Sequence, residues 1–143
     1  MKQKQKVLFL CTGNSCRSQM AEGLAKHYIS DSITAFSAGI EKHGLNPYAV
    51  QVMQEIGIDI SSNNSKTVSE IGEKEFDYVI TVCGHAHETC PYFPAKTEVI
   101  HRGFDDPPFL TRELTAEKEI LSVYRRVRDE IKEYILTLPE RLQ

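Results

Sequence analysis

The sequence predicts an α/β fold, a four-stranded parallel sheet with helices on both faces. Two observations support this prediction. Short apolar runs alternate along the chain with segments in which apolar residues recur at helical spacing. The length of 143 residues suits one domain and makes two unexpected. Strands that alternate with helices form a parallel sheet covered on both faces, and ligands bind beyond the carboxyl ends of its strands.

Composition indicates a single globular domain over residues 1–143. Apolar residues make up 41% of the chain and charged residues 26%, which is ordinary for a folded protein and not for a disordered one. A chain of this size buries about 68–70% of its unfolded surface, enough for a real core. The net charge of -3 argues against broad binding to nucleic acids, so any anion must be held by a local site.

The N-terminus does not have the pattern of a signal peptide. The basic start MKQKQK is followed by the apolar run Val7–Leu10, which is shorter than the ~7–15 residues of a signal-peptide core. No stretch approaches the ~20 apolar residues of a membrane span. We expect a cytoplasmic monomer that contacts neither membrane nor nucleic acid and whose four cysteines are reduced.

The first strand is expected at residues 6–11, where KVLFLC forms a compact apolar run. A helix follows at once from Arg17, because apolar side chains share one face of a 3.6-residue period. They are Met20, Ala21, Leu24, Ala25, Tyr28 and Ile29. Cys11 therefore stands where the strand ends and the loop to the helix begins.

The middle of the chain supplies two further strands, at residues 33–39 and 77–83. The helix between them has Asn46 as its cap, Pro47 at its first position and Gly57 as its stop. A shorter helix is expected around residues 67–71.

The C-terminal third supplies a fourth strand at residues 98–103 and a long final helix that ends before Pro139. The apolar stripe of this helix consists of Leu121, Tyr124, Val127, Ile131, Ile135 and Leu138. The basic run Arg125, Arg126 and Arg128 is expected on its solvated face.

The loop CTGNSCRS, between the first strand and the first helix, has the properties of an oxyanion site. The backbone N–H groups of Thr12, Gly13, Asn14, Ser15 and Cys16 can converge on one point, and the helix adds its N-terminal amides. Gly13 tolerates unusual dihedral angles, and Asn14 can adopt the left-handed conformation. Arg17 offers a planar fork to two oxygens of a tetrahedral anion. The same field is expected to lower the pKa of Cys11 and activate its thiol as a nucleophile.

The pattern C-x5-R-S at residues 11–18, with a downstream Asp-Pro, resembles the catalytic loop of the low-molecular-weight tyrosine phosphatases and of the arsenate reductases that share their fold. The resemblance implies that Cys11 is the nucleophile, Arg17 binds the oxyanion and Ser18 hydrogen-bonds the thiolate. It also implies that Asp106, in GFDDPPF, is the general acid. Pro107 biases Asp106 towards extended backbone, and Asp105 is expected to be an ordinary turn or surface residue.

The whole chain resembles the thioredoxin-linked arsenate reductases. The matching segments are CTGNSCRSQMAEG, SAGIEKHGLNP, TVC…TCP, GFDDP and YRRVRDEI. The resemblance implies that Cys11 attacks arsenate, that Cys83 then attacks the Cys11 sulfur as arsenite leaves, and that Cys90 attacks Cys83. Thioredoxin would reduce the resulting disulfide, and no cofactor is expected.

The last step of this relay, the attack of Cys90 on Cys83, requires a change of conformation. If residues 84–90 are helical in the reduced protein, Cys83 and Cys90 stand roughly 10 Å apart. A disulfide needs Cα atoms within about 4.4–6.8 Å, so such a helix must unwind or loop out.

Two departures from the resemblance bear on function. Some family members bind potassium behind the loop through an Asn, a Glu, a Ser and an Asp; Asn14, Glu22 and Ser37 match, but Lys66 stands in place of the Asp. An ammonium there can replace the cation, so we predict no dependence on potassium. Tyrosine phosphatases commonly place an aromatic residue directly after the Asp-Pro, where this chain has Pro108 and then Phe109.

Two alternatives to the reductase remain open from the sequence. One is a low-molecular-weight tyrosine phosphatase in which Cys83 and Cys90 are incidental; under either interpretation Cys16 is expected to be structural, although a Cys11–Cys16 disulfide off the reaction path is chemically open. The other is a non-enzymatic metal-binding protein, because Cys83, His85, His87 and Cys90 contain enough ligands for a tetrahedral zinc. Their spacing fits no common zinc module, and we predict no metal site.

Overall fold

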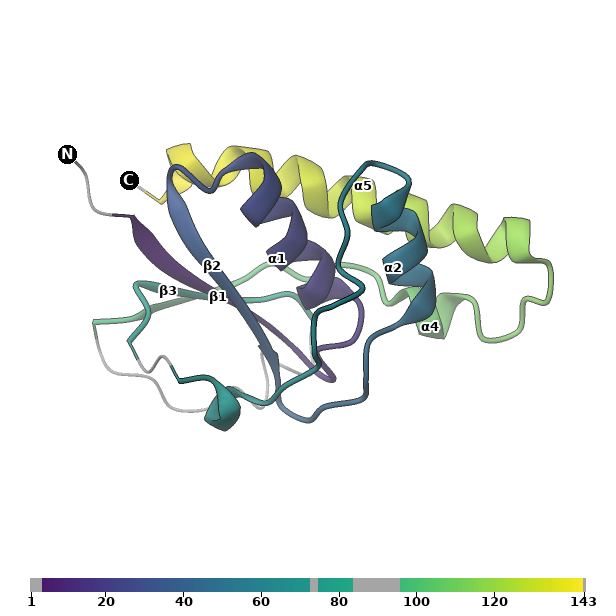
Figure 1. Cartoon of the computed structure of the whole chain (residues 1–143), viewed down its shortest axis with the longest axis horizontal. Helices are drawn as coiled ribbons and strands as arrows, with labels where there is room; N and C mark the ends of the chain where they lie inside the picture. Colours follow the sequence, from purple (N-terminus) through teal and green to yellow (C-terminus); the bar gives the residue numbers. More distant parts are fainter. Residues whose placement is uncertain (1–3, 73–74, 84–95, 143) are drawn as a thin grey trace.

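The computed structural model describes residues 4–72, 75–83 and 96–142. It confirms the predicted parallel sheet, with four strands in the order β2-β1-β3-β4 (Figure 1). The strands are β1 (Gln5–Cys11), β2 (Ile33–Gly39), β3 (Tyr78–Thr81) and β4 (Glu98–His101). The helices are α1 (Arg17–Tyr28), α2 (Pro47–Gln54), η1 (Val68–Glu70), α4 (Pro107–Leu110) and α5 (Glu117–Arg141).

Strand β1 lies in the middle of the sheet, and its run Val7–Leu10 is fully buried. Cys11 pairs with Gly39 at the end of β2, and Leu10 pairs with Thr81 at the end of β3. Pairing continues one residue further, since Val82 N donates to Leu10 O at 2.9 Å. The carboxyl ends of three strands therefore meet at one edge, and this register places Cys83 beside Cys11.

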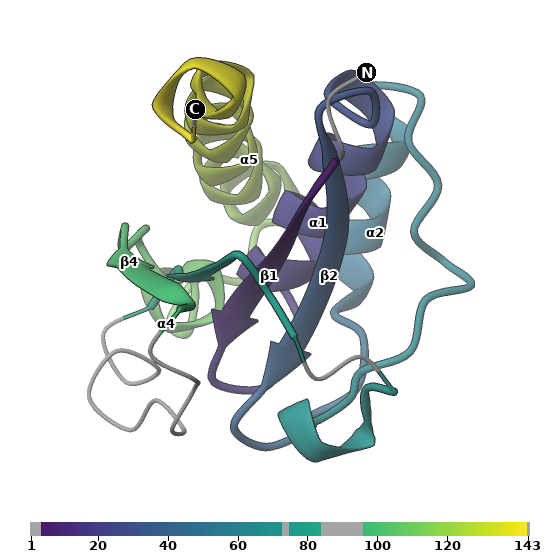
Figure 2. The ribbon, with the colours of Figure 1, turned by 90° about the vertical axis from the view of Figure 1, so that its left-hand side faces the viewer.

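The two faces of the sheet are covered differently. Ser37 and Phe36 are neighbours in β2, so their side chains point to opposite faces. Ser37 hydrogen-bonds to Glu22 of α1, whereas the Phe36 ring packs 5.4 Å from the ring of Phe76 in the segment that leads into β3. In Figure 2, α1, α2 and α5 lie on one side of the strands, and the one-turn helix η1 lies on the other.

Helix α2 begins and ends as the sequence predicts. The Asn46 side chain accepts hydrogen bonds from Tyr48 N at 2.8 Å and Ala49 N at 3.2 Å, which satisfies two free amides of the first turn. Pro47 occupies the first helical position. Gly57 has a φ of 81°, in the left-handed region where glycine follows a helix.

Helix α5 does not end before Pro139 as predicted, but continues through it to Arg141. Pro139 lacks an N–H and removes one hydrogen bond from the last turn. Leu138 and Leu142 are only 0% and 2% exposed, and Leu142 N donates to Leu138 O at 2.9 Å. Burial of Leu142 therefore offsets the missing hydrogen bond and keeps the last turn helical.

The prediction of a fully solvated basic run in α5 is wrong for Arg128. This side chain is 8% exposed and donates to Val52 O in α2 at 2.8 Å and to Glu55 at 3.1 Å. Arg125 forms a three-bond contact with the same Glu55 carboxylate at distances of 2.6–3.1 Å. The basic run thus attaches α5 to α2.

Two smaller features differ from the prediction. The short helix α4 directly follows Asp106, in a segment expected to be a loop. Tyr28 of α1 is 37% exposed although its position in the apolar stripe predicts burial. Within the described ranges, no helix is both long enough and apolar enough to cross a membrane.

Candidate active site

A pocket of about 380 Å³ lies at the carboxyl end of β1. It brings Asp106, which is distant in the sequence, together with Cys11 and Arg17 of the loop after β1. The other lining residues are Thr12, Gly13, Ser15, Cys16, His43, Asn46 and Pro108. All the predicted loop residues except Asn14 and Ser18 therefore face this pocket.

The loop after β1 is held by the segment that follows β2. The carbonyls of Cys11, Thr12, Gly13 and Ser15 accept hydrogen bonds from Ile40 N, Glu41 N, His43 N and Asn46 N, at distances of 2.9–3.1 Å. The C=O and N–H of one peptide plane point in opposite directions. Carbonyls that bond outward therefore leave the next N–H groups directed away from that segment, which prepares the loop for an anion.

Two glycines allow this close packing. A Cβ on Gly39 would lie 2.3 Å from Glu41 O and 2.7 Å from Asn14 N, so the backbone of the loop would have to move. A Cβ on Gly13 would lie 2.3 Å from His43 Nδ1. The expectation that Gly13 is needed for unusual dihedral angles is wrong, because it is not among the glycines with positive φ. Its role is to let His43 approach.

Asn14 adopts the predicted left-handed conformation, with a φ of 48°. It is fully buried behind the pocket, and its side-chain amide uses both donors and both acceptor positions. Nδ2 donates to Ser18 Oγ at 2.9 Å and to Ser37 Oγ at 3.0 Å. Oδ1 accepts from Gln19 Nε2 at 3.0 Å and from Lys66 N at 2.9 Å. The strained conformation is thus held by four bonds.

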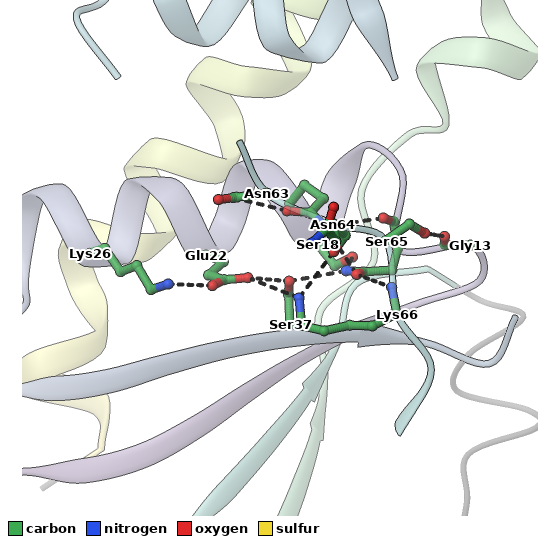
Figure 3. A network of polar contacts seen from close by, with 11 residues as sticks. Gly13, Ser18, Glu22, Lys26, Ser37, Asn63, Asn64, Ser65 and Lys66 are labelled. Atoms are coloured by element: carbon green, nitrogen blue, oxygen red, sulfur yellow. Dashed lines mark hydrogen bonds and ion pairs between the residues drawn. The ribbon is translucent and has the colours of Figure 1, made fainter. Parts of the chain in front are cut away.

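The same network reaches a buried carboxylate on α1 (Figure 3). Glu22 is 6% exposed and accepts from Ser37 Oγ. The ammonium groups of Lys26 and Lys66 lie 2.5 Å and 3.9 Å from its two oxygens. The four positions matched to a potassium site do come together here, but a lysine ammonium stands among them in place of an oxygen donor. These residues do not fit a potassium ion.

Ser18 lies at the start of α1 and is fully buried. Its hydroxyl oxygen accepts from Asn14, so its proton remains available to a second acceptor. That Ser18 donates to the Cys11 sulfur stays a prediction.

Arg17 is 8% exposed, and two of its nitrogens have partners. Nη1 donates to Phe104 O at 3.0 Å, and Nη2 lies 3.7 Å from Asp106 Oδ1. Nε is buried and has no hydrogen-bond partner in the part of the chain that the structure describes. A buried N–H without an acceptor is costly, and an oxyanion oxygen in the pocket would satisfy it.

Asp106 has the extended backbone that Pro107 predicts, with φ -92° and ψ 103°. It occupies the cap position of α4, but its carboxylate makes no capping hydrogen bond. The carboxylate is instead 45% exposed and faces the pocket beside Arg17. The neighbouring Asp105 is 60% exposed and pairs with Arg126 of α5 at 3.1 Å, which confirms the prediction of a surface residue.

The pairing of β1 with β3 brings Cys83 alongside Cys11, and Thr12 Oγ1 lies 3.1 Å from the Cys83 sulfur. The pKa of Cys11 is raised well above its usual value, first by the hydrogen bond with Cys83 and then by burial. The Arg17 charge and the hydrogen bond from the Thr12 N–H lower the pKa of Cys11, but Cys83 and burial raise it by more. The expectation of a lowered pKa for Cys11 is therefore wrong, because a second thiol shares its site.

The two remaining cysteines are Cys16 and Cys90. Cys16 is 5% exposed, and burial raises the pKa of its thiol to about 12. Cys11, Cys16 and Cys83 are free thiols. Cys90, His85 and His87 lie outside the described residues, as does the rest of segment 84–90, for which the sequence left a helix open. Within residues 4–72, 75–83 and 96–142, no group of three His, Cys, Asp or Glu side chains is placed to hold a metal.

Sequence reasoning missed His43 and Asn46 as pocket residues. Both belong to SAGIEKHGLNP, which matches the arsenate reductases in sequence, but His43 has no predicted role there and Asn46 is predicted only as the cap of a helix. No local pattern indicates that this segment runs along the loop after β1. The parallel pairing of Cys11 with Gly39 places it there.

Comparisons with known proteins agree with this arrangement. The family model for low molecular weight phosphotyrosine protein phosphatases matches residues 6–143. The chain is 50% identical over 137 residues to an arsenate reductase from Halalkalibacterium halodurans, covering 96% of each protein. It is also 50% identical over 125 residues to an arsenate reductase from Bacillus subtilis, covering 87% of this chain and 88% of that one.

Solved structures show the same likeness. An arsenate reductase in a phosphate-binding state is 33% identical, with a TM-score of 0.72 over 97% of this chain and 99% of that one. An arginine phosphatase from Geobacillus stearothermophilus is 27% identical, with a TM-score of 0.72 over 97% of this chain and 93% of that one. The chain therefore belongs to the low molecular weight phosphotyrosine protein phosphatase family, and both relatives named above at 50% identity are arsenate reductases.

Proposed function

We propose that this protein reduces arsenate to arsenite through a relay of three cysteines. The observation that supports it best is that strand pairing places Cys83 beside Cys11, which lines an oxyanion pocket. A phosphatase needs one cysteine and a water molecule. A second thiol beside the nucleophile is what a two-electron reduction requires.

In the first step, arsenate binds against the loop amides and the Arg17 guanidinium. The unpartnered Arg17 Nε supports this placement, because it would donate to one oxygen while the loop amides bind the others. The Cys11 sulfur, as thiolate, attacks arsenic, and one arsenate oxygen leaves as water. Asp106 would protonate that oxygen, since its carboxyl group faces the pocket.

In the second step, the Cys83 thiolate attacks the Cys11 sulfur. The sulfur–arsenic bond breaks, and its electron pair stays on arsenic, which passes from the +5 to the +3 state. The two thiols together lose two electrons and form the Cys11–Cys83 disulfide. The balance is one arsenate and two thiols giving one arsenite, one disulfide and one water. Thr12 Oγ1, 3.1 Å from Cys83, would stabilise the attacking thiolate.

In the third step, Cys90 attacks Cys83, which frees Cys11 and moves the disulfide to Cys83–Cys90. We propose thioredoxin as the reductant that returns this disulfide to thiols, and the cytoplasm as the compartment where it does so. We also propose that the protein acts as a monomer. The free thiols of Cys11, Cys16 and Cys83 are compatible with a reducing compartment.

Hydrolysis of aryl phosphates is a second candidate activity. It is favoured by the match to the phosphotyrosine phosphatase family and by the loop that both reactions share. Phosphate has the shape and charge of arsenate, so the pocket admits both. Pro108 at the rim of the pocket gives no aromatic wall at that position, and we expect phosphate-ester turnover to be weak.

Disulfide mapping after a single turnover tests the relay. Fully reduced protein receives one equivalent of arsenate without thioredoxin, is quenched with acid, and is analysed by peptide mass spectrometry. We expect a Cys83–Cys90 disulfide and one equivalent of arsenite. Cys90→Ser should stop at the Cys11–Cys83 disulfide, and Cys16→Ala should behave as wild type. Four free thiols without arsenite would exclude the reductase.

A further inference from the structure

Phe104 lies in the irregular segment between β4 and α4, and its backbone reaches two parts of the active site. Its N–H donates to Val82 O at 3.0 Å, and Val82 directly precedes Cys83. Its carbonyl accepts from Arg17 Nη1 at 3.0 Å. One residue is thus bonded both to the chain that carries the second thiol and to the guanidinium of the oxyanion pocket.

The bond to the Phe104 carbonyl decides which edge of the Arg17 guanidinium is left for an anion. A guanidinium can bind two oxygens through Nε and Nη2, whose N–H groups point the same way along one edge of the planar fork. Because Phe104 occupies Nη1, this edge stays available in the pocket that Arg17 lines. Nε has no hydrogen-bond partner within the described residues, and Nη2 lies 3.7 Å from Asp106 Oδ1.

The aromatic ring of Phe104 fixes the position of this carbonyl. Phe104 is 8% exposed, and its ring meets the ring of Tyr134 on α5 edge to face, with centroids 5.9 Å apart. The Arg102 guanidinium lies 4.3 Å from the centroid of the Phe104 ring. These contacts hold a residue whose own segment, 102–106, has no regular secondary structure.

We propose that Phe104 is a positioning residue for oxyanion binding, which holds Arg17 with its bidentate edge towards the pocket. The ring anchors Phe104 on α5, the N–H anchors it to Val82, and the carbonyl transmits this position to Arg17. The inference rests on the part of the proposed function in which Arg17 binds the oxyanion. It does not depend on the redox steps, so inorganic phosphate, which does not oxidise thiols, is a suitable probe.

The test is the dissociation constant of inorganic phosphate for the reduced protein, measured by isothermal titration calorimetry at fixed ionic strength. Phe104→Leu keeps an apolar side chain at this buried position but loses the aromatic contacts. We expect it to raise the dissociation constant about three- to tenfold, as for one lost hydrogen bond between Arg17 and the anion. Tyr134→Leu removes the ring on which Phe104 packs and should change the dissociation constant in the same direction.

Phe36→Leu is the matched control. The Phe36 ring, on β2, also packs edge to face on another ring, that of Phe76, with centroids 5.4 Å apart. Both Phe→Leu substitutions should lower the melting temperature, because each removes an aromatic contact. Phe36→Leu should nevertheless keep the phosphate dissociation constant within about twofold of the wild-type value. A purely structural role for Phe104 would make the two variants alike in affinity as well.

A double-mutant cycle with Arg17 tests the route of the effect. Arg17→Lys keeps the charge but lacks the fork, so adding Phe104→Leu to it should change the phosphate dissociation constant by less than about twofold. Single turnovers of arsenite release give a second readout. Phe104→Leu should raise the arsenate concentration at half-maximal rate and keep the limiting rate within about twofold, since Arg17 contacts the anion before and during the reaction.

Three results would overturn the inference. One is a phosphate dissociation constant in Phe104→Leu equal to that in Phe36→Leu; another is an effect of Phe104→Leu that persists in full in Arg17→Lys protein. The third is a loss confined to the limiting rate, which would connect Phe104 to Asp106 instead. Wild-type protein that binds phosphate but releases no arsenite would contradict the proposed function and leave this inference standing, which keeps the two failures distinct.

Discussion

At the scale of single residues, the raised pKa of Cys11 is the property that most affects reactivity. Arg17 and a loop amide favour the thiolate, while the Cys83 thiol and burial oppose it. The pKa of Cys11 is therefore raised, and the position of Cys83 bears on how readily Cys11 forms the thiolate, which is the reactive form of a cysteine.

Removal of the Cys83 thiol should lower the pKa of Cys11. The hydrogen bond with Cys83 is the largest cause of the raised value, and Cys83→Ala eliminates it. A lower pKa means more thiolate at neutral pH, so alkylation of Cys11 by iodoacetamide should be faster and its pH profile should shift to lower pH. The measurement is the Cys11 alkylation rate from pH 6 to 10, followed by tandem mass spectrometry. Cys16→Ala is the control, and an unshifted profile in Cys83→Ala would assign the effect to burial alone.

At the scale of elements, long-range polar contacts join pieces of backbone that the hydrophobic core alone does not align. Arg128 and Arg125 attach α5 to the end of α2 through Glu55 and Val52 O. Glu22 gathers α1, β2 and the segment at Lys66 around one buried carboxylate. Both clusters lie away from the pocket, yet they orient elements that form its walls.

Arg128→Ala should destabilise the protein by about 1–3 kcal/mol at pH 7, because the buried Val52 carbonyl loses its charged donor. The pKa of Glu55 is lowered, first by its hydrogen bond from Arg125. The ionised Glu55 carboxylate therefore stabilises the folded protein above its unfolded pKa of about 4.3. This contribution to stability is lost as the pH falls through the lower pKa that Glu55 has in the folded state. The difference in the free energy of unfolding between wild type and Arg128→Ala should therefore narrow below about pH 4. Urea unfolding measures both effects.

Arg126→Ala is the matched control for that experiment. Its guanidinium pairs with Asp105 and Glu130 on the surface, and all three side chains are at least 43% exposed. Such pairs contribute about 0–1 kcal/mol. Equal losses in the two variants would show that the buried carbonyl contact at Arg128 has no special weight.

Wild-type activity should not depend on potassium, because the Lys66 ammonium already lies 3.9 Å from Glu22. Arsenite release should be equal in potassium chloride and choline chloride at the same ionic strength. Lys66→Asp removes the ammonium and adds an oxygen ligand, so potassium should accelerate this variant specifically. Lys26→Ala is the control that changes a charge beside Glu22 without adding a ligand. A potassium effect in wild type would contradict the prediction.

At the scale of the whole molecule, an anionic protein has to bind an anion. The chain carries a net charge of -3, so the global field opposes oxyanions and the pocket has to overcome it locally. Arg17 is the guanidinium that lines the pocket. Because only the folded state assembles this pocket, an oxyanion that binds there must stabilise the fold.

Phosphate should therefore raise the melting temperature in a concentration-dependent way. A phosphate concentration of about one hundred times its dissociation constant should raise the free energy of unfolding by about 2.7 kcal/mol. Arg17→Lys keeps the charge but loses the planar fork, so most of the shift should vanish. Thermal unfolding in phosphate and in chloride of equal ionic strength measures this, with Arg126→Lys as the control. An undiminished shift in Arg17→Lys would place the anion elsewhere.

The sequence alone was sufficient for features that depend on neighbouring residues. The strand at residues 33–39 and the capped start of α2 follow from local periodicity and from the chemistry of Asn46 and Pro47. The left-handed Asn14 and the extended Asp106 follow in the same way from residue type and from the proline that comes next. These are short-range effects, which the order of residues specifies directly.

Only the tertiary structure decided the features that depend on contacts across the sheet. The pKa of Cys11 follows from Cys83, which is 72 residues away and is brought alongside by the pairing of β1 with β3. Helix α5 continues past Pro139 because Leu142 is buried, and the Tyr124 hydroxyl of α5 accepts a hydrogen bond from Asn46, which is 78 residues away in the sequence. Electrostatics and burial depend on distance in space, and the fold determines that distance.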